Sequence, residues 1–187
     1  HEIIHDLREI KTEKVCAQVN ELVNLAHSEE INEVLLWDHS LYDIDYYPER
    51  FRTGPGGTID LDNTEFWEWL KDDYRQMLDR VSEADGLVLT FIETGAYAER
   101  QFSKKMKSSE EKLAAVVNAI SDVLIGERKK KLYIRTFAYS EEEYKGTTGC
   151  IEYLKYDEVI LMMKETPHDF FLTHPDNYYI QKMDRPV

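Results

Sequence analysis

The sequence predicts a parallel α/β fold, a segment of a (β/α)8 TIM-type barrel. Short apolar runs that end in polar residues recur four times, and helical patterns separate one run from the next. Such runs are typical of strands buried on both faces, and their alternation with helices indicates a parallel sheet with right-handed crossovers. The loops after the predicted strands are longer than the turns before them, as the functional face of a barrel requires.

The elements follow in order along the chain. The first is an amphipathic helix at residues 7–27. Apolar side chains at three- and four-residue steps define its buried stripe: Val15, Val19, Leu22, Val23 and Ala26. A strand is predicted at residues 34–38, and a loop rich in Tyr, Pro and Gly follows at residues 39–63. A second helix is predicted at residues 65–80, with a core stripe of its own.

The same alternation continues to the end of the chain. We expect further strands at residues 86–92, 132–138 and 159–164, and helices at residues 109–125 and 141–153. Ser108 suits the N-cap of the longer of these helices. Because four or five strands cannot close an eight-stranded barrel, residues 1–187 are expected to form a single α/β segment of a larger (β/α)8 domain. No GxGxxG or P-loop motif follows any strand, which argues against a doubly wound nucleotide-binding fold.

Composition narrows the expected partners. The chain has 187 residues and a formal net charge of −14, which repels nucleic-acid backbones and anionic membrane surfaces. Cys16 and Cys150 lie far apart and in no metal-binding spacing, so neither a disulfide framework nor a zinc site is expected. No apolar run reaches transmembrane length and nothing resembles a signal peptide, and no compartment is assigned.

Polar side chains stand where each predicted strand meets its loop. They are Asp38 and His39, then Glu93, then Arg135 and Tyr139, and finally Lys164 with His168 and Asp169. In a barrel these ends converge on one pocket. Glu93 directly follows an apolar strand, so we expect it to be partly desolvated, which raises a carboxyl pKa and suits a proton donor.

Other interpretations of these residues stay open. Arg135 could equally pair with a carboxylate to hold the fold together, and Asp38 and His39 could cap the following loop. A metal-dependent enzyme using Asp38, His39, His168 and Asp169 ranks low, since no ligand pair has the spacing of a known metal motif.

Four stretches of sequence are similar to motifs of one enzyme family. In chain order they are Gly56-Gly57-Thr58-Ile59-Asp60-Leu61-Asp62, Ile92-Glu93-Thr94-Gly95, Ile134-Arg135-Thr136-Phe137-Ala138-Tyr139, and residues 159–170, which contain Lys164-Glu165-Thr166-Pro167-His168-Asp169-Phe170. In these stretches the chain resembles the α-glucuronidase family of glycoside hydrolases, which have a (β/α)8 barrel and remove 4-O-methylglucuronic acid from xylan fragments with inversion.

The resemblance implies roles for individual residues. Glu93 would be the general acid and Asp169 a candidate base, while Arg135 and Lys164 would bind the sugar. His39 and Tyr139 are added as substrate-binding residues because they lie at strand ends. The implied substrate is a carbohydrate, with a uronic acid as one candidate component, and neither a metal nor an organic cofactor is needed.

The chain departs from the family just before the acid. The family has Lys-Ala-Asp-Ser before its Glu, whereas this chain has Leu89-Thr90-Phe91-Ile92. This departure motivates the alternative of a catalytically inactive carbohydrate-binding barrel. The family's second candidate base would fall beyond Val187, so the remainder of the parent chain is expected to complete the pocket.

Overall fold

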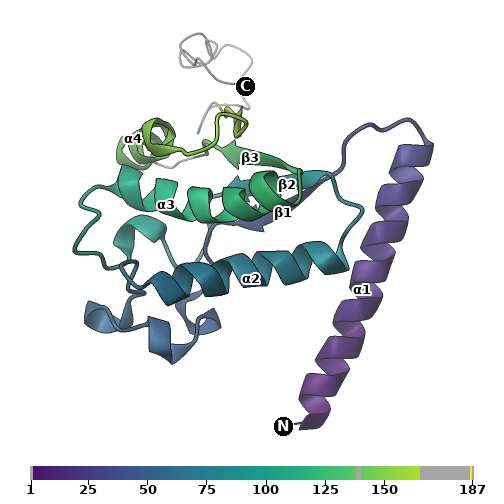
Figure 1. The fold of residues 1–187 in the computed structure, drawn as a ribbon, viewed down its shortest axis with the longest axis horizontal. Helices are drawn as coiled ribbons and strands as arrows, with labels where there is room; N and C mark the ends of the chain where they lie inside the picture. Colours follow the sequence, from purple (N-terminus) through teal and green to yellow (C-terminus); the bar gives the residue numbers. More distant parts are fainter. Residues whose placement is uncertain (1, 138–139, 165–185, 187) are drawn as a thin grey trace.

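The computed structural model of the chain describes residues 2–137, 140–164 and 186. Its centre is a four-stranded parallel sheet with the strands in sequence order (Figure 1). The strands are β1 (Leu35–His39), β2 (Gly86–Thr90), β3 (Lys131–Arg135) and β4 (Ile160–Met162). All three neighbouring pairs are parallel. The prediction of a parallel α/β fold with consecutive strands side by side is confirmed.

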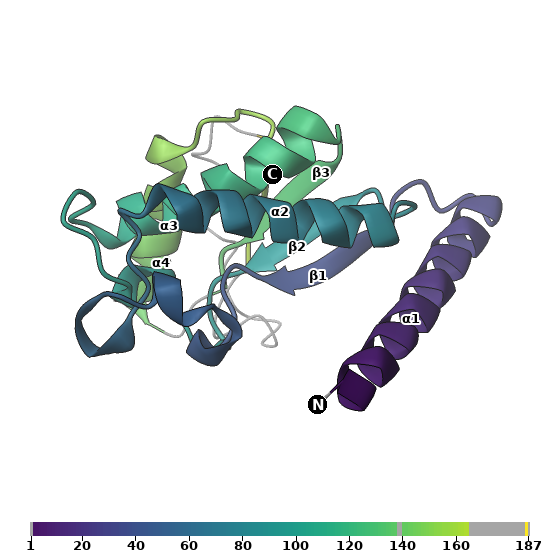
Figure 2. The same cartoon turned by 60° about the horizontal axis from the view of Figure 1, so that its bottom comes forward.

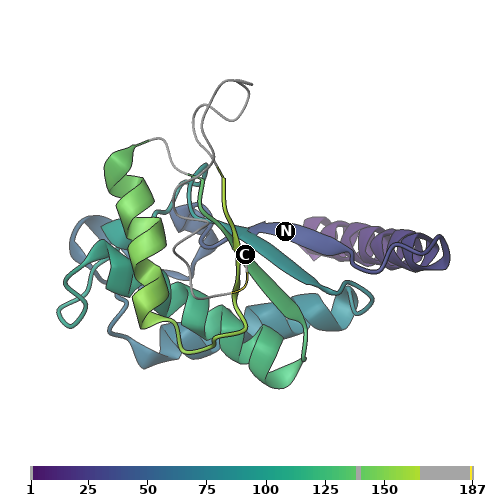
Figure 3. The same ribbon diagram turned by 90° about the horizontal axis from the view of Figure 1, so that it is seen from above.

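Helices cover one face of this sheet (Figure 3). They are α2 (Thr64–Arg80) and α3 (Ser109–Ser121), with α4 (Glu141–Gly149) packed against α3. Alternate strand residues point into the core that the helices close: Leu87, Leu89, Leu132, Ile134 and Leu161. Right-handed crossovers between consecutive neighbouring strands put their helices on the same side of a sheet, so the one-sided layer follows from the strand order.

The other face of the sheet carries the remaining alternate residues. In the register of β1, β2 and β3, Trp37 lies beside Val88 and Val88 beside Tyr133. The Trp37 side chain is 54% exposed on the edge strand β1. Within the described residues no helix packs on this face, although Val88 in the central strand β2 is buried.

The first helix, α1 (Glu2–Ser28), extends away from the sheet (Figures 1 and 2). The predicted buried stripe is found in part: Val23 is buried and Val19 and Ala26 are half-buried, but Val15 is 46% and Leu22 65% exposed. Polar contacts also attach the helix, since the Asn20 amide donates to the Arg80 carbonyl oxygen at 2.9 Å. The sequence periodicity predicted the helix correctly but could not show that the described chain covers only part of its apolar side.

Element ends differ modestly from the predictions. Strand β2 stops at Thr90 rather than at residue 92, and the third and fourth strands are also shorter than predicted. The predicted helix at residues 109–125 passes into a π-helical turn at Asp122–Glu127, and α4 passes into a 3-10 turn at Cys150–Tyr153. Further 3-10 turns shape the loops: Ile44–Tyr46, Glu49–Phe51, Pro55–Gly57 and Ala98–Arg100.

Local capping explains where the core helices begin. Ser108 accepts a hydrogen bond from the Glu111 N–H, and the Glu111 carboxylate accepts one from the Ser108 N–H, which completes the predicted cap as a capping box. At the far edge of the sheet the Leu161 N–H donates to the Pro186 carbonyl oxygen at 3.0 Å. The backbone at residue 186 therefore lies beside β4.

Candidate functional site

The carboxyl ends of β1 and β2 hold a shallow pocket of about 530 Å³. Two of the predicted site residues, His39 and Glu93, line it together with Tyr42, Asp43, Thr94 and Gly95. His39 ends β1, and Glu93 follows β2 by three residues. The prediction that these two strand ends come together is confirmed for His39 and Glu93.

Contacts between the two loops hold the pocket in shape. The His39 Nδ1 atom lies 3.2 Å from the Ile92 carbonyl oxygen, and the Thr94 hydroxyl donates to the Leu41 carbonyl oxygen. At Gly95 the loops touch so closely that an added Cβ would stand 1.7 Å from Oδ1 of Asp43. A larger residue at position 95 would have to displace the exposed Asp43 side chain, so the loop after β2 lies closely against the loop after β1.

Glu93 itself differs from the prediction. Its side chain is exposed, whereas partial desolvation was expected. The backbone explains the difference: Phe91 and Ile92 continue into the core, and Glu93 then takes a left-handed conformation with φ 64°, which turns its side chain outward. Such a conformation is uncommon outside glycine and marks a residue that the surrounding structure holds in place.

Arg135 lies at the end of β3 between two aromatic rings. Its guanidinium carbon is 5.0 Å from the ring centroid of Trp37 and 4.3 Å from that of Phe137. The described part of the chain offers it no ion pair, so the structural pairing considered for Arg135 is not found there. Sequence reasoning missed Trp37 and Phe137, although Trp37, two residues before His39, belongs on the same face of the strand.

Lys164 joins this group from beyond β4. Its Nζ atom lies 5.4 Å from the Phe137 ring centroid, and its backbone N–H donates to the Thr136 hydroxyl at 3.0 Å. The Thr136 N–H in turn donates to the Met162 carbonyl oxygen. These bonds place Arg135 and Lys164, two cations, around one aromatic ring at the carboxyl ends of β3 and β4.

Asp38 does not belong to this site, contrary to the expectation that all the strand ends converge. Successive side chains of a strand point to opposite faces, so Asp38 points toward the helices while His39 points the other way. Asp38 is buried there and accepts hydrogen bonds from the Tyr42 and Tyr74 hydroxyls. The metal-site alternative needed both residues in one pocket, and no group of three or more His, Cys, Asp or Glu in the described residues could hold a metal ion.

The remaining predicted site residues, Tyr139 and Asp169, lie outside the described residues, as does His168. The separation of the Glu93 and Asp169 carboxyl groups therefore stays a prediction. No family model, no curated protein and no solved structure matches the chain. Among the helices that the structure describes, none has the length and apolar character needed to cross a membrane.

Proposed function

We propose that the chain is part of a (β/α)8 barrel that binds an acidic carbohydrate at the carboxyl ends of its strands and hydrolyses a glycosidic bond. The strand order supports the barrel, because consecutive parallel neighbours with helices on one side are its repeating arrangement. A doubly wound sheet would reverse its strand order and carry helices on both faces. The described sheet does neither.

The arrangement of Arg135 carries the proposal for the ligand. Its guanidinium is flanked by Trp37 and Phe137, has no ion pair within the described residues, and lies in the same cluster as Lys164. Guanidinium groups bind carboxylates through two parallel hydrogen bonds, and aromatic faces supply apolar area beside them. A uronic acid combines the two features needed here, a carboxylate and a ring with apolar C–H faces.

Glu93 is the proposed proton donor. It lines the pocket with His39, and its left-handed backbone holds it at the mouth. In glycoside hydrolysis a carboxylic acid protonates the leaving oxygen while a second carboxylate activates water or attacks the sugar. We assign the second role to Asp169, at a separation of about 6.5–9.5 Å if the reaction inverts and about 5 Å if it retains.

Binding can be measured without turnover. Titrating the isotope-labelled chain with glucuronate should shift the Trp37 indole N–H resonance, and an equal concentration of glucose should shift it far less. In Arg135→Ala, glucuronate and glucose should shift the Trp37 indole N–H resonance equally. If glucuronate and glucose act alike on the unmodified chain, the assignment of an acidic sugar is wrong.

Catalysis is tested with branched acidic xylo-oligosaccharides, whose products are identified by mass spectrometry. Glu93→Gln should lower the rate by roughly 10²- to 10⁴-fold, the usual contribution of a general acid. The control is Glu83→Gln, an exposed carboxylate near the opposite end of β2, which should leave the rate unchanged. Equal rates for the two variants would show that Glu93 is not the general acid.

One observation favours the alternative, a carbohydrate-binding barrel without catalysis. Glu93 is exposed, whereas a general acid usually works in a site from which water is excluded. The two functions differ in one result. A binding barrel would show the glucuronate-specific shift of Trp37 and release no sugar from any substrate.

A further inference from the structure

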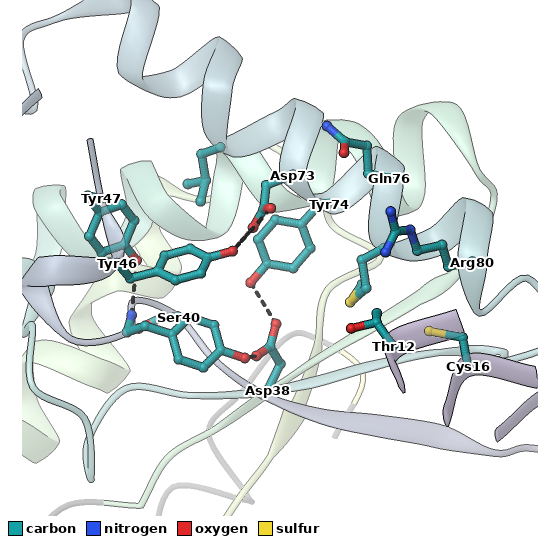
Figure 4. Close-up of a pocket in the computed structure, with 13 residues that line it drawn as sticks. Thr12, Cys16, Asp38, Ser40, Tyr46, Tyr47, Asp73, Tyr74, Gln76 and Arg80 are labelled. Carbon is teal, nitrogen blue, oxygen red and sulfur yellow. Dashed lines mark hydrogen bonds between the residues drawn. The ribbon is translucent and has the colours of Figure 1, made fainter. Parts of the chain in front are cut away.

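A second cavity lies on the helix-covered side of β1 and shares Tyr42 with the strand-end pocket. It occupies about 380 Å³ between β1 and α2, with α1 at one end (Figure 4). Its volume falls within the range of small-ligand sites. Apolar groups from Leu70, Met77 and Cys16 form part of the wall, and polar side chains of β1 and α2 form the rest.

The first polar group in the cavity is the Asp38 carboxylate. It is 7% exposed and accepts three hydrogen bonds: from the Tyr42 hydroxyl, from the Tyr74 hydroxyl at 2.9 Å, and from the His39 N–H at 2.9 Å. All three donors are neutral. A buried carboxylate normally has a cationic partner, because leaving water is costly for a charge. Asp38 forms no ion pair within the described residues.

A second carboxylate, Asp73, enters the same cavity from α2. It is half-buried and accepts a hydrogen bond from the Tyr46 hydroxyl, which lies 3.0 and 3.1 Å from its two oxygens. Burial raises the pKa of Asp73 and the negative charge of Asp38 raises it further, while the Tyr46 hydrogen bond opposes the shift. Figure 4 shows Arg80 at the other end of the cavity, near Cys16 and Thr12.

A third, independent feature is the hydroxyl of Ser40. Ser40 lies two residues after Asp38, on the same face of the extended chain, and lines the cavity. The residue is 2% exposed and its Oγ atom has no hydrogen-bond partner. Buried hydroxyls are nearly always paired, so this oxygen leaves one hydrogen bond to be made inside the cavity.

Tyrosine rings complete the wall around the acidic end. The ring centroids of Tyr42 and Tyr46 are 5.4 Å apart, and so are those of Tyr46 and Tyr47. The faces of such rings attract cations, most strongly where water is excluded. Two carboxylates with no ion pair within the described residues, a hydroxyl with no hydrogen-bond partner and several ring faces all favour a positively charged guest with N–H donors, and the apolar wall favours an alkyl group.

We propose that this cavity binds a small aliphatic amine, with its ammonium group against Asp38 and Asp73 and its alkyl chain against Leu70 and Met77. The site shares Tyr42 with the strand-end pocket but opens on the helix-covered face of β1, and its charge is opposite to that of the Arg135 and Lys164 cluster. The sugar site presents cations at the ends of β3 and β4, whereas this cavity presents carboxylates behind β1.

The test uses n-butylammonium chloride as the probe and the full chain. Isotope-labelled protein is titrated and followed by NMR, with sodium chloride at equal concentration as the ionic-strength control and 1-butanol as the uncharged probe of similar shape. We expect saturable shifts around Ser40 and Asp73 with butylammonium only. Equal shifts with butanol, or shifts that sodium or calcium ions reproduce, would overturn the proposal.

Matched variants locate the charge. Asp73→Asn removes one carboxylate and should weaken butylammonium binding at least tenfold. Asp72→Asn is the control, because Asp72 is its exposed neighbour and pairs with Arg75 outside the cavity. Equal affinity of the two variants would place the cation elsewhere. Should Asp73→Asn fail to fold, the comparison of butylammonium with butanol on the unmodified chain decides the question by itself.

Discussion

At the scale of single residues, the alternation of side chains along β1 decides which chemistry each residue serves. Asp38 and His39 are adjacent in sequence, yet Asp38 lies in the buried network with Tyr42 and Tyr74, and His39 lines the strand-end pocket. The sequence identified both as polar residues at a strand end. It could not show that their neighbours in space differ, because Tyr74 is contributed by a helix 36 positions away in the chain.

The Asp38 network gives a stability prediction. Tyr74→Phe removes the donor that stands 2.9 Å from the Asp38 Oδ2 atom and leaves that buried oxygen unsatisfied. The free energy of unfolding should fall by about 1–3 kcal/mol, as is usual when a buried acceptor loses its partner. Tyr153→Phe, at a tyrosine that is 52% exposed, should change it by less than about 0.5 kcal/mol. Urea denaturation measures the free energy of unfolding of both variants. Equal losses would show that the Tyr74 hydrogen bond to Asp38 does not stabilise the fold.

Asp85 predicts how stability depends on pH. Its Oδ2 atom accepts hydrogen bonds from the Val34 N–H at 2.7 Å and pairs with His27 Nε2 at 2.9 Å. Burial raises the pKa of Asp85, but these hydrogen bonds and the neighbouring positive charges outweigh it, so the pKa is lowered. A lowered carboxyl pKa stabilises the fold above the unfolded-state value of about 3.9, and this stabilisation is lost as the pH falls through the folded-state pKa.

Asp85→Asn should therefore lower the free energy of unfolding by about 1 kcal/mol at pH 7, because a hydrogen bond to a charged group contributes about 1.5–3 kcal/mol and solvent screens part of this for a side chain that is 32% exposed. The difference from the unmodified chain should shrink as the pH falls below about 4. Asp79→Asn is the control, because Asp79 is 61% exposed in its pair with Arg128 and should have little effect at either pH. If the difference in unfolding free energy between Asp85→Asn and the unmodified chain grew on acidification, the stabilising role of the ionised Asp85 would be contradicted.

At the scale of elements, the sequence predicted where helices and strands begin, because capping residues and apolar runs are local features of the chain. The capping residues before α3 predicted its first residue, and all four apolar runs became strands whose first residues lie within one position of the prediction. The ends were less predictable. Phe91 and Ile92 continue the apolar run of β2 but leave the ladder, because they pack into the core as the chain turns toward Glu93.

The capping box at α3 can be tested with two neighbouring serines. Ser108→Ala removes the hydroxyl that accepts from the Glu111 N–H at 3.2 Å and should cost about 1 kcal/mol of unfolding free energy. Ser109→Ala changes the first helical residue, where alanine is a better helix former, and should be neutral or slightly stabilising. Denaturant curves for the pair distinguish a cap from a general effect of removing a hydroxyl.

At the scale of the whole molecule, the sheet and its helices form a continuous core while α1 stands largely outside it. Side chains of β2, β3, α2 and α3 share one buried cluster. In residues 11–28 of α1, Val23 is the one buried apolar side chain. Periodicity in the sequence could predict that α1 is a helix with an apolar side. Whether that side is covered depends on tertiary partners, which no local pattern contains.

This unequal distribution of contacts predicts two levels of stability in hydrogen exchange. Amides in residues 11–28 should exchange through local opening with a small free energy, because few buried contacts oppose it, whereas amides of β2 should exchange only through global unfolding.

Val23→Ala should speed exchange in α1 alone. Leu132→Ala, which opens a cavity in the core beneath β3, should lower the opening free energy of β2 by about 2–5 kcal/mol. Mass spectrometry of peptides from α1 and β2 gives both values, and equal opening free energies for the two elements would show that α1 is an integral part of the cooperative core.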